Sequence, residues 1–176
     1  MIRQSFIIMM VLITLSQGKT LIVDYAGTGD SKTLSEAVSL ATPGDEIIVK
    51  PGTYSGAIID RSLSISGSGE AKINSQGGSA LQIIAPECKI SNLSISGSGS
   101  IPGVVIRSSN NILNRCFVQG SSTGISIDGR NNTIIESQIN SSLGIELIGS
   151  GCKVARRPLY PLYRLHFHLS NQSVGH

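Results

Sequence analysis

The sequence predicts an all-β protein, a right-handed parallel β-helix solenoid with a short N-terminal capping helix. Three observations predict it. The 176 residues include 25 Ile, 28 Ser and 20 Gly but only 14% charged residues, which disfavours both coiled coils and disorder. The motif Gly-[Val/Ile]-x-[Ile/Leu] recurs at intervals of 21 and 20 residues, at Gly103, Gly124 and Gly144. Apolar and polar residues alternate with period two inside each copy, as in a strand with one buried face.

A second marker advances with the first. The pattern Ile-x-[Asn/Glu]-x-x-[Ile/Phe] recurs at intervals of 22 residues, beginning at Ile90, Ile112 and Ile134. The heptapeptide LSISGSG also occurs twice, at 63–69 and 93–99. We therefore predict coils of about 21 residues over 51–154, stacked about 4.8 Å apart around columns of Ile.

Asn and Glu occupy the same place in this second marker. Asn92, Asn114 and Glu136 are therefore expected to stack in one column at a corner of the coils. Stacked Asn side chains can hydrogen-bond along such a ladder.

The segment 19–50 is predicted to form an N-terminal cap of strand, amphipathic helix and strand. Thr33 and Glu36 form a capping box at the start of the helix. One apolar face follows at helical spacing, with Leu34, Ala37, Val38 and Ala41. The run 46–50 (EIIVK) is the first strand after the helix. Such a helix would cover the otherwise unpaired first coil.

Residues 1–18 are typical of a secretory signal peptide. Arg3 supplies a positive start, residues 5–15 form an apolar run of 11, and small residues precede a cut after Gly18. A retained anchor is the alternative, but spanning a bilayer needs about 20 apolar residues, and Lys19 ends the run too early. We expect cleaved export, a secreted or cell-surface location, and no membrane contact after cleavage.

Residues 155–176 form an atypical basic tail. They hold three His, three Arg and no acidic residue, whereas 19–154 carry 10 basic and 11 acidic residues, so the net charge of +3 arises at the two ends. The coils therefore offer no basic stripe to nucleic acid. Two interpretations stay open: a native cap over the last coil, or a truncation or frameshift product that leaves a fragment of a longer solenoid.

The three cysteines, Cys88, Cys116 and Cys152, match no zinc-binding spacing. Cys88 and Cys152 occupy the same point of the repeat three coils apart, roughly 14 Å, which exceeds the limit of about 7 Å for bridged Cα atoms. We therefore expect no disulfide. Because 19–154 contain no His and no Met, the ligands that copper prefers are absent from the coils. We predict no cofactor and no metal site.

The opening of the chain resembles a known family. Residues 26–69, which contain AGTG, the capping helix, PGDEIIVK and PGTY, are similar to the opening of pectin-lyase-like parallel β-helix proteins. The later coils resemble the carbohydrate-binding and sugar-hydrolysis type of β-helix repeat. That resemblance implies contact with polysaccharide and leaves activity open, because the group includes lyases, hydrolases, esterases, adhesins and non-catalytic surface proteins.

No catalytic residue can be transferred from this resemblance. The opening is similar to that of pectin methylesterases, yet Tyr54 is followed by Ser55, Gly56 and Ala57 where those enzymes carry a glutamate. Their QDT-like, DFIFG-like and LGRPW-like segments do not occur in this sequence.

The residues themselves lead to the same expectation. Glycoside hydrolysis needs two carboxylates about 5–10 Å apart. Asp128 has Arg107 one coil before it and is expected to form an ion pair with it. Glu146 is expected to point outward, and neither it nor Glu136 has a partner acid in its column.

We therefore predict no catalytic, cofactor-binding or metal-binding residues. The favoured function is an exported, non-catalytic β-helix module that contacts polysaccharide or cell-surface components. The alternative is a polysaccharide-active enzyme, whole or in part: a lyase, a hydrolase or an esterase.

Overall fold

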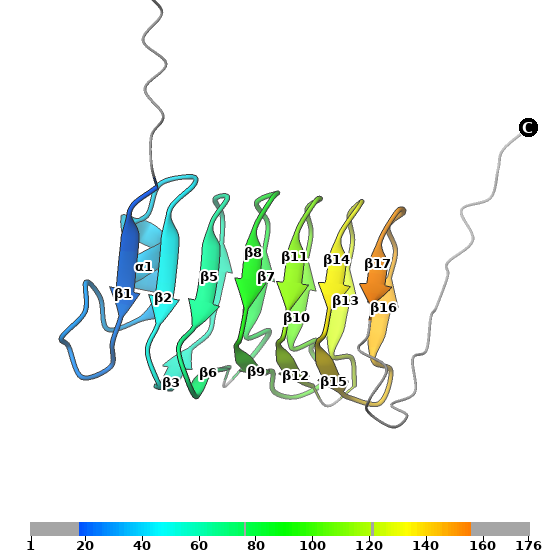
Figure 1. The fold of residues 1–176 in the computed structure, drawn as a ribbon. Coiled ribbons are helices and arrows are strands. Elements are labelled where there is room, and N and C mark those ends of the chain that lie inside the picture. Colours follow the sequence, from blue (N-terminus) through cyan, green and yellow to red (C-terminus); the bar gives the residue numbers. More distant parts are fainter. Residues whose placement is uncertain (1–17, 76, 121, 156–176) are drawn as a thin grey trace, which may run out of the picture.

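The computed structural model describes residues 18–75, 77–120 and 122–155, and it shows a β-solenoid of about five turns with one short helix near its N-terminal end. Each complete coil contributes one strand to each of three parallel sheets, and the first sheet has one further strand at each end. The strands of successive coils therefore lie side by side along the stack (Figure 1). The predicted all-β architecture and its parallel stacking are confirmed.

The first sheet has seven strands, in the order β1 (Thr20–Val23), β2 (Glu46–Val49), β5 (Ser64–Gly67), β8 (Lys89–Ser91), β11 (Ile112–Asn114), β14 (Thr133–Ile135) and β17 (Lys153–Ala155). The second sheet contains β3 (Gly52–Ser55), β6 (Ala71–Asn74), β9 (Ser94–Ser96), β12 (Phe117–Gln119) and β15 (Gln138–Asn140). The third sheet contains β4 (Ala57–Ile59), β7 (Leu81–Ile83), β10 (Val104–Ile106), β13 (Ile125–Ile127) and β16 (Ile145–Leu147).

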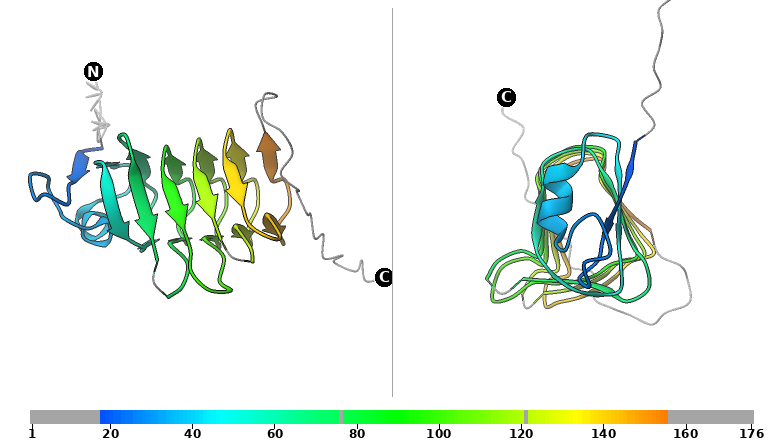
Figure 2. Two further views of the ribbon diagram at one scale, coloured as in Figure 1. Left: turned by 90° about the horizontal axis from the view of Figure 1, so that it is seen from below. Right: turned by 90° about the vertical axis from the view of Figure 1, so that its left-hand side faces the viewer.

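Helix α1 (Leu34–Leu40) covers the N-terminal end of the stack, as Figure 2 shows in the end-on view. The hydroxyl of Thr33 accepts a hydrogen bond from the Glu36 amide at 3.2 Å, which confirms the predicted cap. The Glu36 carboxylate accepts a hydrogen bond from the Lys32 amide at 3.3 Å. In a standard capping box it would accept from the amide of the N-cap residue, Thr33. The apolar face predicted from the helical spacing is buried against β1 and the first coils.

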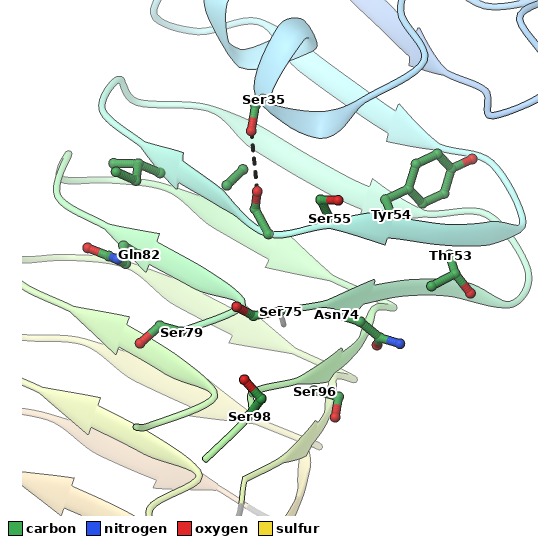
Figure 3. A pocket seen from close by; sticks show the side chains of 14 residues that line it. Ser35, Thr53, Tyr54, Ser55, Asn74, Ser75, Ser79, Gln82, Ser96 and Ser98 are labelled. Carbon is green, nitrogen blue, oxygen red and sulfur yellow. Dashed lines mark hydrogen bonds between the residues drawn. The ribbon is translucent and has the colours of Figure 1, made fainter. Parts of the chain in front are cut away.

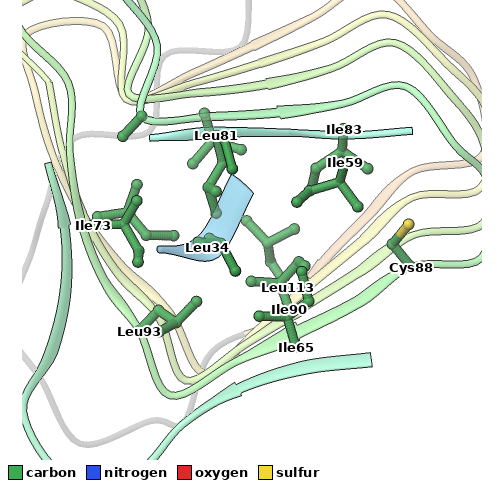
Figure 4. Packing of buried hydrophobic residues seen from close by; sticks show 14 of the residues in the cluster. Leu34, Ile59, Ile65, Ile73, Leu81, Ile83, Cys88, Ile90, Leu93 and Leu113 are labelled. Carbon is green, nitrogen blue, oxygen red and sulfur yellow. The ribbon is translucent and has the colours of Figure 1, made fainter. Parts of the chain in front are cut away.

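The interior consists of apolar columns that run the length of the stack (Figure 4). In the first sheet, for example, Ile65, Ile90, Leu113 and Ile134 follow one another in register and are at most 2% exposed. Burial of β-branched and Leu side chains against the adjacent coils supplies the main stabilising free energy of such a solenoid.

The second sequence marker was one residue out of register in the middle coil. Leu113, not Ile112, is the partner of Ile90, and Ile112 pairs with the exposed Lys89. The interval is thus 23 residues from β8 to β11 but 21 from β11 to β14. The difference lies in the loops that join the second sheet to the third, because the other two corners keep a constant length.

This register changes the composition of the corner column. Asn92 aligns with Arg115 and Glu136, whereas Asn114 pairs with Ser91 and Ile135, so the predicted Asn92–Asn114–Glu136 column is wrong. The three residues that do align have positive φ angles of 54°, 52° and 50°, which turn the chain tightly from the first sheet into the second. Arg115 Nε donates to Glu136 Oε2 at 2.9 Å.

The asparagine ladder occurs instead at the corner before the first sheet. Asn132 Oδ1 accepts hydrogen bonds from the backbone and side-chain nitrogens of Asn111, at 2.9 and 3.0 Å, and Asn111 Oδ1 accepts from the Cys88 amide at 2.9 Å. The register places Cys88 and Cys152 at the two ends of this ladder, three coils apart as predicted. All three cysteines are free thiols.

The two copies of LSISGSG occupy different faces of the solenoid. Residues 64–67 of the first copy form β5 in the first sheet, and residues 94–96 of the second form β9 in the second sheet. The string therefore recurs because both sheets need the same alternation, and it does not mark equivalent points of two coils.

At the other end of the stack, Ile139, Leu147, Cys152 and Val154 pack against the core but are only partly buried. Ala155 closes β17, so the first residue of the predicted tail belongs to a strand. Residues 1–17 of the predicted signal peptide and 156–176 of the tail lie outside the described residues. Within the described ranges, no helix has the length and apolarity needed to cross a membrane.

Candidate functional site

A polar hollow of about 970 Å³ lies along the corner between the second and third sheets, near the capped end (Figure 3). Its floor and walls come from β3, β6 and β9, from β4 and β7, and from the loops that join them. The lining residues are Ser35, Thr53, Tyr54, Ser55, Gly56, Ala57, Ile58, Asn74, Ser75, Ser79, Gln82, Ser96, Gly97 and Ser98.

Strand alternation and register together build this polar wall. Ser55, Asn74 and Ser96 occupy the last positions of three adjacent strands and stack in one outward-facing column. Ser35 from α1 closes the capped end, where its hydroxyl donates to the Gly56 carbonyl at 3.3 Å. The sequence is rich in Ser, but only the register shows that serines from three coils and from the capping helix face one hollow.

Apart from Ala57 and Ile58, the side chains that line this polar hollow carry hydroxyl or amide groups, which both donate and accept hydrogen bonds. Among the described lining residues the one titratable side chain is Tyr54, and it is buried. Its hydroxyl already donates to the Val23 carbonyl at 3.4 Å and accepts from the Tyr25 amide at 3.3 Å. The polar hollow is thus suited to binding hydroxyl-bearing ligands rather than to transferring protons.

A second hollow of about 500 Å³, the sheet-face hollow, adjoins the first and shares Ser79 and Gln82 with it. It lies over the outer face of the third sheet and is more apolar. Its lining residues are Gly77, Gly78, Ser79, Gln82, Ile101, Pro102, Val105, Ile106, Arg107, Ser126, Asp128 and Ile148. Together the two hollows span the coils from β4 to β16, four strand steps or roughly 19 Å along the stack.

Arg107 and Asp128 are the charged residues of the sheet-face hollow. They follow the paired residues Ile106 and Ile127 and are therefore neighbours in register, as predicted. The expected ion pair between them is not formed: the described residues form three ion pairs, and this is not among them. Both side chains are exposed, so water competes with the contact.

Glu146 points outward from β16, and its carboxylate accepts a hydrogen bond from the Ser126 hydroxyl at 3.3 Å. Asp128 lies on the same face, one strand away and two residues along. From strand spacing and rise, the two Cα atoms are about 8 Å apart. The sequence analysis looked for partner acids only at positions directly above one another in adjacent coils. The diagonal pair of Asp128 and Glu146 was therefore not predicted.

Glu136 and two acidic residues near the cap, Asp24 and Asp30, have structural contacts. Glu136 is paired with Arg115, which sequence reasoning did not identify. Asp24 accepts hydrogen bonds from Thr28 and from the Ala26 amide within its own loop. Asp30 accepts from the Ile22 amide at 2.8 Å and fixes the loop after β1. Within the described ranges, no group of three or more His, Cys, Asp or Glu side chains could hold a metal ion.

The thiols of Cys88 and Cys116 are not activated. Cys116 is 2% exposed, and desolvation raises the pKa of its thiol to about 11. Burial also raises the pKa of Cys88. Both groups are therefore protonated near neutral pH and pack as small apolar residues.

No protein-family model matches the sequence, and no curated protein matches it. Solved structures do match the fold. A pectate lyase, Pel9A, superposes with a TM-score of 0.59 at 17% identity over 79% of this chain and 48% of its own. A pectin methylesterase from carrot superposes with a TM-score of 0.52 at 14% identity over 78% of this chain and 64% of its own.

These neighbours define the class: the chain has a pectin-lyase-like parallel β-helix fold. The structural neighbours are polysaccharide-active enzymes. The chain spans about half of the lyase and less than two thirds of the esterase, and identities below 20% show the fold alone.

Proposed function

We propose that this chain is an exported, non-catalytic β-helix module that contacts a neutral polysaccharide along the two adjoining hollows. The observation that carries the proposal is the polar hollow, whose hydroxyl and amide side chains come from several coils and face one long concave surface. A sugar chain presents hydroxyls at regular intervals, and a stacked scaffold presents hydrogen-bonding groups about every 4.8 Å along its axis.

The charge of the surface favours a neutral chain over a polyanionic one. No charged residue is among the described residues that line the polar hollow. On the outer face of the third sheet, Asp128 and Glu146 outnumber Arg107, and Asp60 is paired with Arg61. A carboxylate-rich polysaccharide would meet like charges there, without a basic cluster to bind it.

The proposal is tested with the full chain and immobilised polysaccharides. We expect the chain to bind neutral glucans or galactans and to bind polygalacturonate at least tenfold more weakly, with and without EDTA. Reduction of the polygalacturonate carboxyl groups to alcohols should restore binding. Asn74→Ala and Gln82→Ala should weaken binding, whereas Asn140→Ala, at the far end of the second sheet, should not. Failure to bind any polysaccharide would refute the proposed contact, and tighter binding of polygalacturonate would refute its neutral specificity.

The alternative function, a polysaccharide-active enzyme, is favoured by one observation. Asp128 and Glu146 form a diagonal pair on one face, and Asp128 lines the sheet-face hollow beside Arg107. Glycoside hydrolysis requires two carboxyl groups about 5–10 Å apart, a separation that side chains on Cα atoms about 8 Å apart can reach. The test is whether the chain releases reducing ends from pectin, alginate or a neutral glucan. If it does, and if both Asp128→Asn and Glu146→Gln abolish the release, the chain is an enzyme and the non-catalytic module is excluded.

Export is tested separately. Expression of the full chain in a secreting host should deliver it to the medium or cell surface, shortened by the 18 residues of the predicted signal peptide. Intact mass and N-terminal sequencing of the recovered protein measure this directly, and retention of the whole chain inside the cell would count against export.

A further inference from the structure

Asp45 is a buried residue of the N-terminal cap, in the loop immediately before β2. Its side chain is part of a residue only 2% exposed, and each of its two oxygens accepts hydrogen bonds. Oδ2 accepts from the backbone nitrogen and hydroxyl of Thr42, at 2.7 and 2.9 Å. Oδ1 accepts from the backbone nitrogen of Lys19 at 2.8 Å. Asp45 thus joins the start of β1 to the loop that leads from α1 into β2.

Lys19 is the first residue after the predicted cleavage point. Its backbone carbonyl accepts from the Glu46 amide at 2.9 Å, and its Nζ donates to the Leu40 carbonyl at 3.0 Å. Both the carbonyl and the Nζ of Lys19 remain after cleavage of the Gly18–Lys19 bond. These two contacts can therefore hold Lys19 in place in the cleaved protein. Gly18 and Lys19 are both exposed, so the peptide bond between them is accessible.

We infer that cleavage between Gly18 and Lys19 creates an α-ammonium group that forms an ion pair with the buried Asp45 carboxylate and thereby locks the N-terminal cap. This inference rests on the export half of the proposed function. In the hydrolysis, the C–N bond breaks, the hydroxyl of water joins the Gly18 carbonyl carbon, and the remaining proton of water joins the Lys19 nitrogen. The new Gly18 carboxyl group then loses a proton to solvent, and the Lys19 amine takes one up to become the α-ammonium. At neutral pH a neutral amide donor becomes a cationic one, without relocation of the nitrogen. Charge-assisted hydrogen bonds to a carboxylate are roughly twice as strong as neutral ones.

The other charged groups near Lys19 are directed elsewhere, so Asp45 is the carboxylate next to the Lys19 backbone nitrogen. The Lys19 ε-ammonium is directed to the helix C-terminus, and Arg61 donates to the Ser39 and Ala41 carbonyls while it pairs with Asp60. Glu46 is exposed on the adjacent strand. Hydrogen bonding, first from the Thr42 amide, holds the pKa of Asp45 below its usual value, so the carboxylate is already ionised throughout the pH range in which an α-amine titrates.

The ion pair has a definite pH dependence. An α-amino group has an unfolded pKa of roughly 7.7–8.0, and a carboxylate partner raises it in the folded protein. The added stability is therefore complete below that unfolded pKa and is lost as the pH rises through the higher folded pKa. Each unit by which the pKa rises corresponds to a tenfold change in the folding equilibrium constant.

The test compares the secreted protein with the uncleaved full chain purified from cytosol. Mass spectrometry should show Lys19 as the first residue of the secreted form. Between pH 7 and 9.5, its folding equilibrium constant should fall at least fivefold more than that of the uncleaved chain. Asp45→Asn should abolish this difference, whereas Glu46→Gln, which changes the exposed neighbouring carboxylate, should preserve it.

A second measurement does not depend on the variants. At neutral pH, acetic anhydride should acetylate the Lys19 α-amine of the folded secreted protein at least fivefold more slowly than that of the urea-unfolded protein. Equal pH responses in the two forms, or equal rates of acetylation, would overturn the ion pair while leaving export standing. No secreted product, or a mature chain that begins at another residue, would overturn both; polysaccharide binding is measured independently of either.

Discussion

Substitution of Asn132 by Ala is the most direct test of the asparagine ladder. Asn132 is 1% exposed and makes three hydrogen bonds through its side chain. Its Oδ1 accepts from both nitrogens of Asn111, and its Nδ2 donates to the Ser108 carbonyl at 2.9 Å. Alanine removes all three. The side-chain nitrogen of Asn111 keeps a partner in the Ser108 hydroxyl, at 2.9 Å, but the backbone nitrogen loses its acceptor.

The magnitude follows from these contacts. A typical hydrogen bond contributes about 1 kcal/mol net, and a buried donor left without a partner costs about 1–3 kcal/mol. Because Asn111 is fully buried, water cannot replace the lost acceptor without local opening. We therefore expect Asn132→Ala to lower the free energy of unfolding by about 3 kcal/mol, a large share of the 5–15 kcal/mol that is typical of domains. The corresponding fall in Tm is about 10 °C.

Urea unfolding followed by far-UV circular dichroism measures this change. The matched control is Asn140→Ala, which replaces an exposed Asn at the end of β15 and should change stability by less than about 0.5 kcal/mol. If Asn132→Ala were no more destabilising than Asn140→Ala, the ladder would not be a stabilising element, and the reasoning from buried hydrogen bonds would be refuted.

Three further predictions concern the core, a tight corner and the cap. Ile127→Asp buries an unpaired charge in a position that is 1% exposed; it should cost several kcal/mol and abolish the β-type circular dichroism spectrum, which Ser126→Ala on the outer face should retain. Gly124→Ala places a Cβ against the Ile139 side chain and 3.0 Å from the Gly144 carbonyl oxygen, and should lower the free energy of unfolding by about 1–3 kcal/mol in urea titrations, whereas Gly77→Ala, with no atom within 4 Å, should be neutral. Ionised Asp45, whose pKa is lowered from 3.8, stabilises the folded state fully above that unfolded value, and this stabilisation is lost as the pH falls through the lower folded value. Asp45→Asn should therefore make the free energy of unfolding fall less steeply below about pH 4. An unchanged fall at acid pH would contradict the stabilising role of the Asp45 carboxylate.

Much of the fold could be predicted from the sequence because a solenoid is a local architecture. Period-two alternation identifies strands such as 104–106 and 125–127, and the Gly-[Val/Ile]-x-[Ile/Leu] marker placed them in the correct register. The capping box and the helical apolar face likewise depend only on residues a few positions apart. These features are properties of short segments, so the sequence contains them directly.

The asparagine column was mispredicted for a physical reason. A one-residue slip moves every side chain of a strand to the other face, and the two sequence markers could not detect that one corner of the coil varies in length. The loop between β9 and β10 is longer than the loop between β12 and β13, so a constant interval aligned Ile112 with Ile90 incorrectly. The true ladder, Asn111 above Asn132, was hidden by the same slip.

The candidate site depended still more on the tertiary structure. Serines and amides from separate coils become one polar hollow only when the coils are stacked, and the diagonal pair of Asp128 and Glu146 arises from two strands and an offset of two residues. The contact between Lys19 and Asp45 joins groups 26 residues apart in the chain. The sequence by itself determined the strands, their apolar faces and the capping helix, because those follow from local periodicity. Only the tertiary structure decided which polar side chains meet, because corner lengths set the register and the register sets every contact between coils.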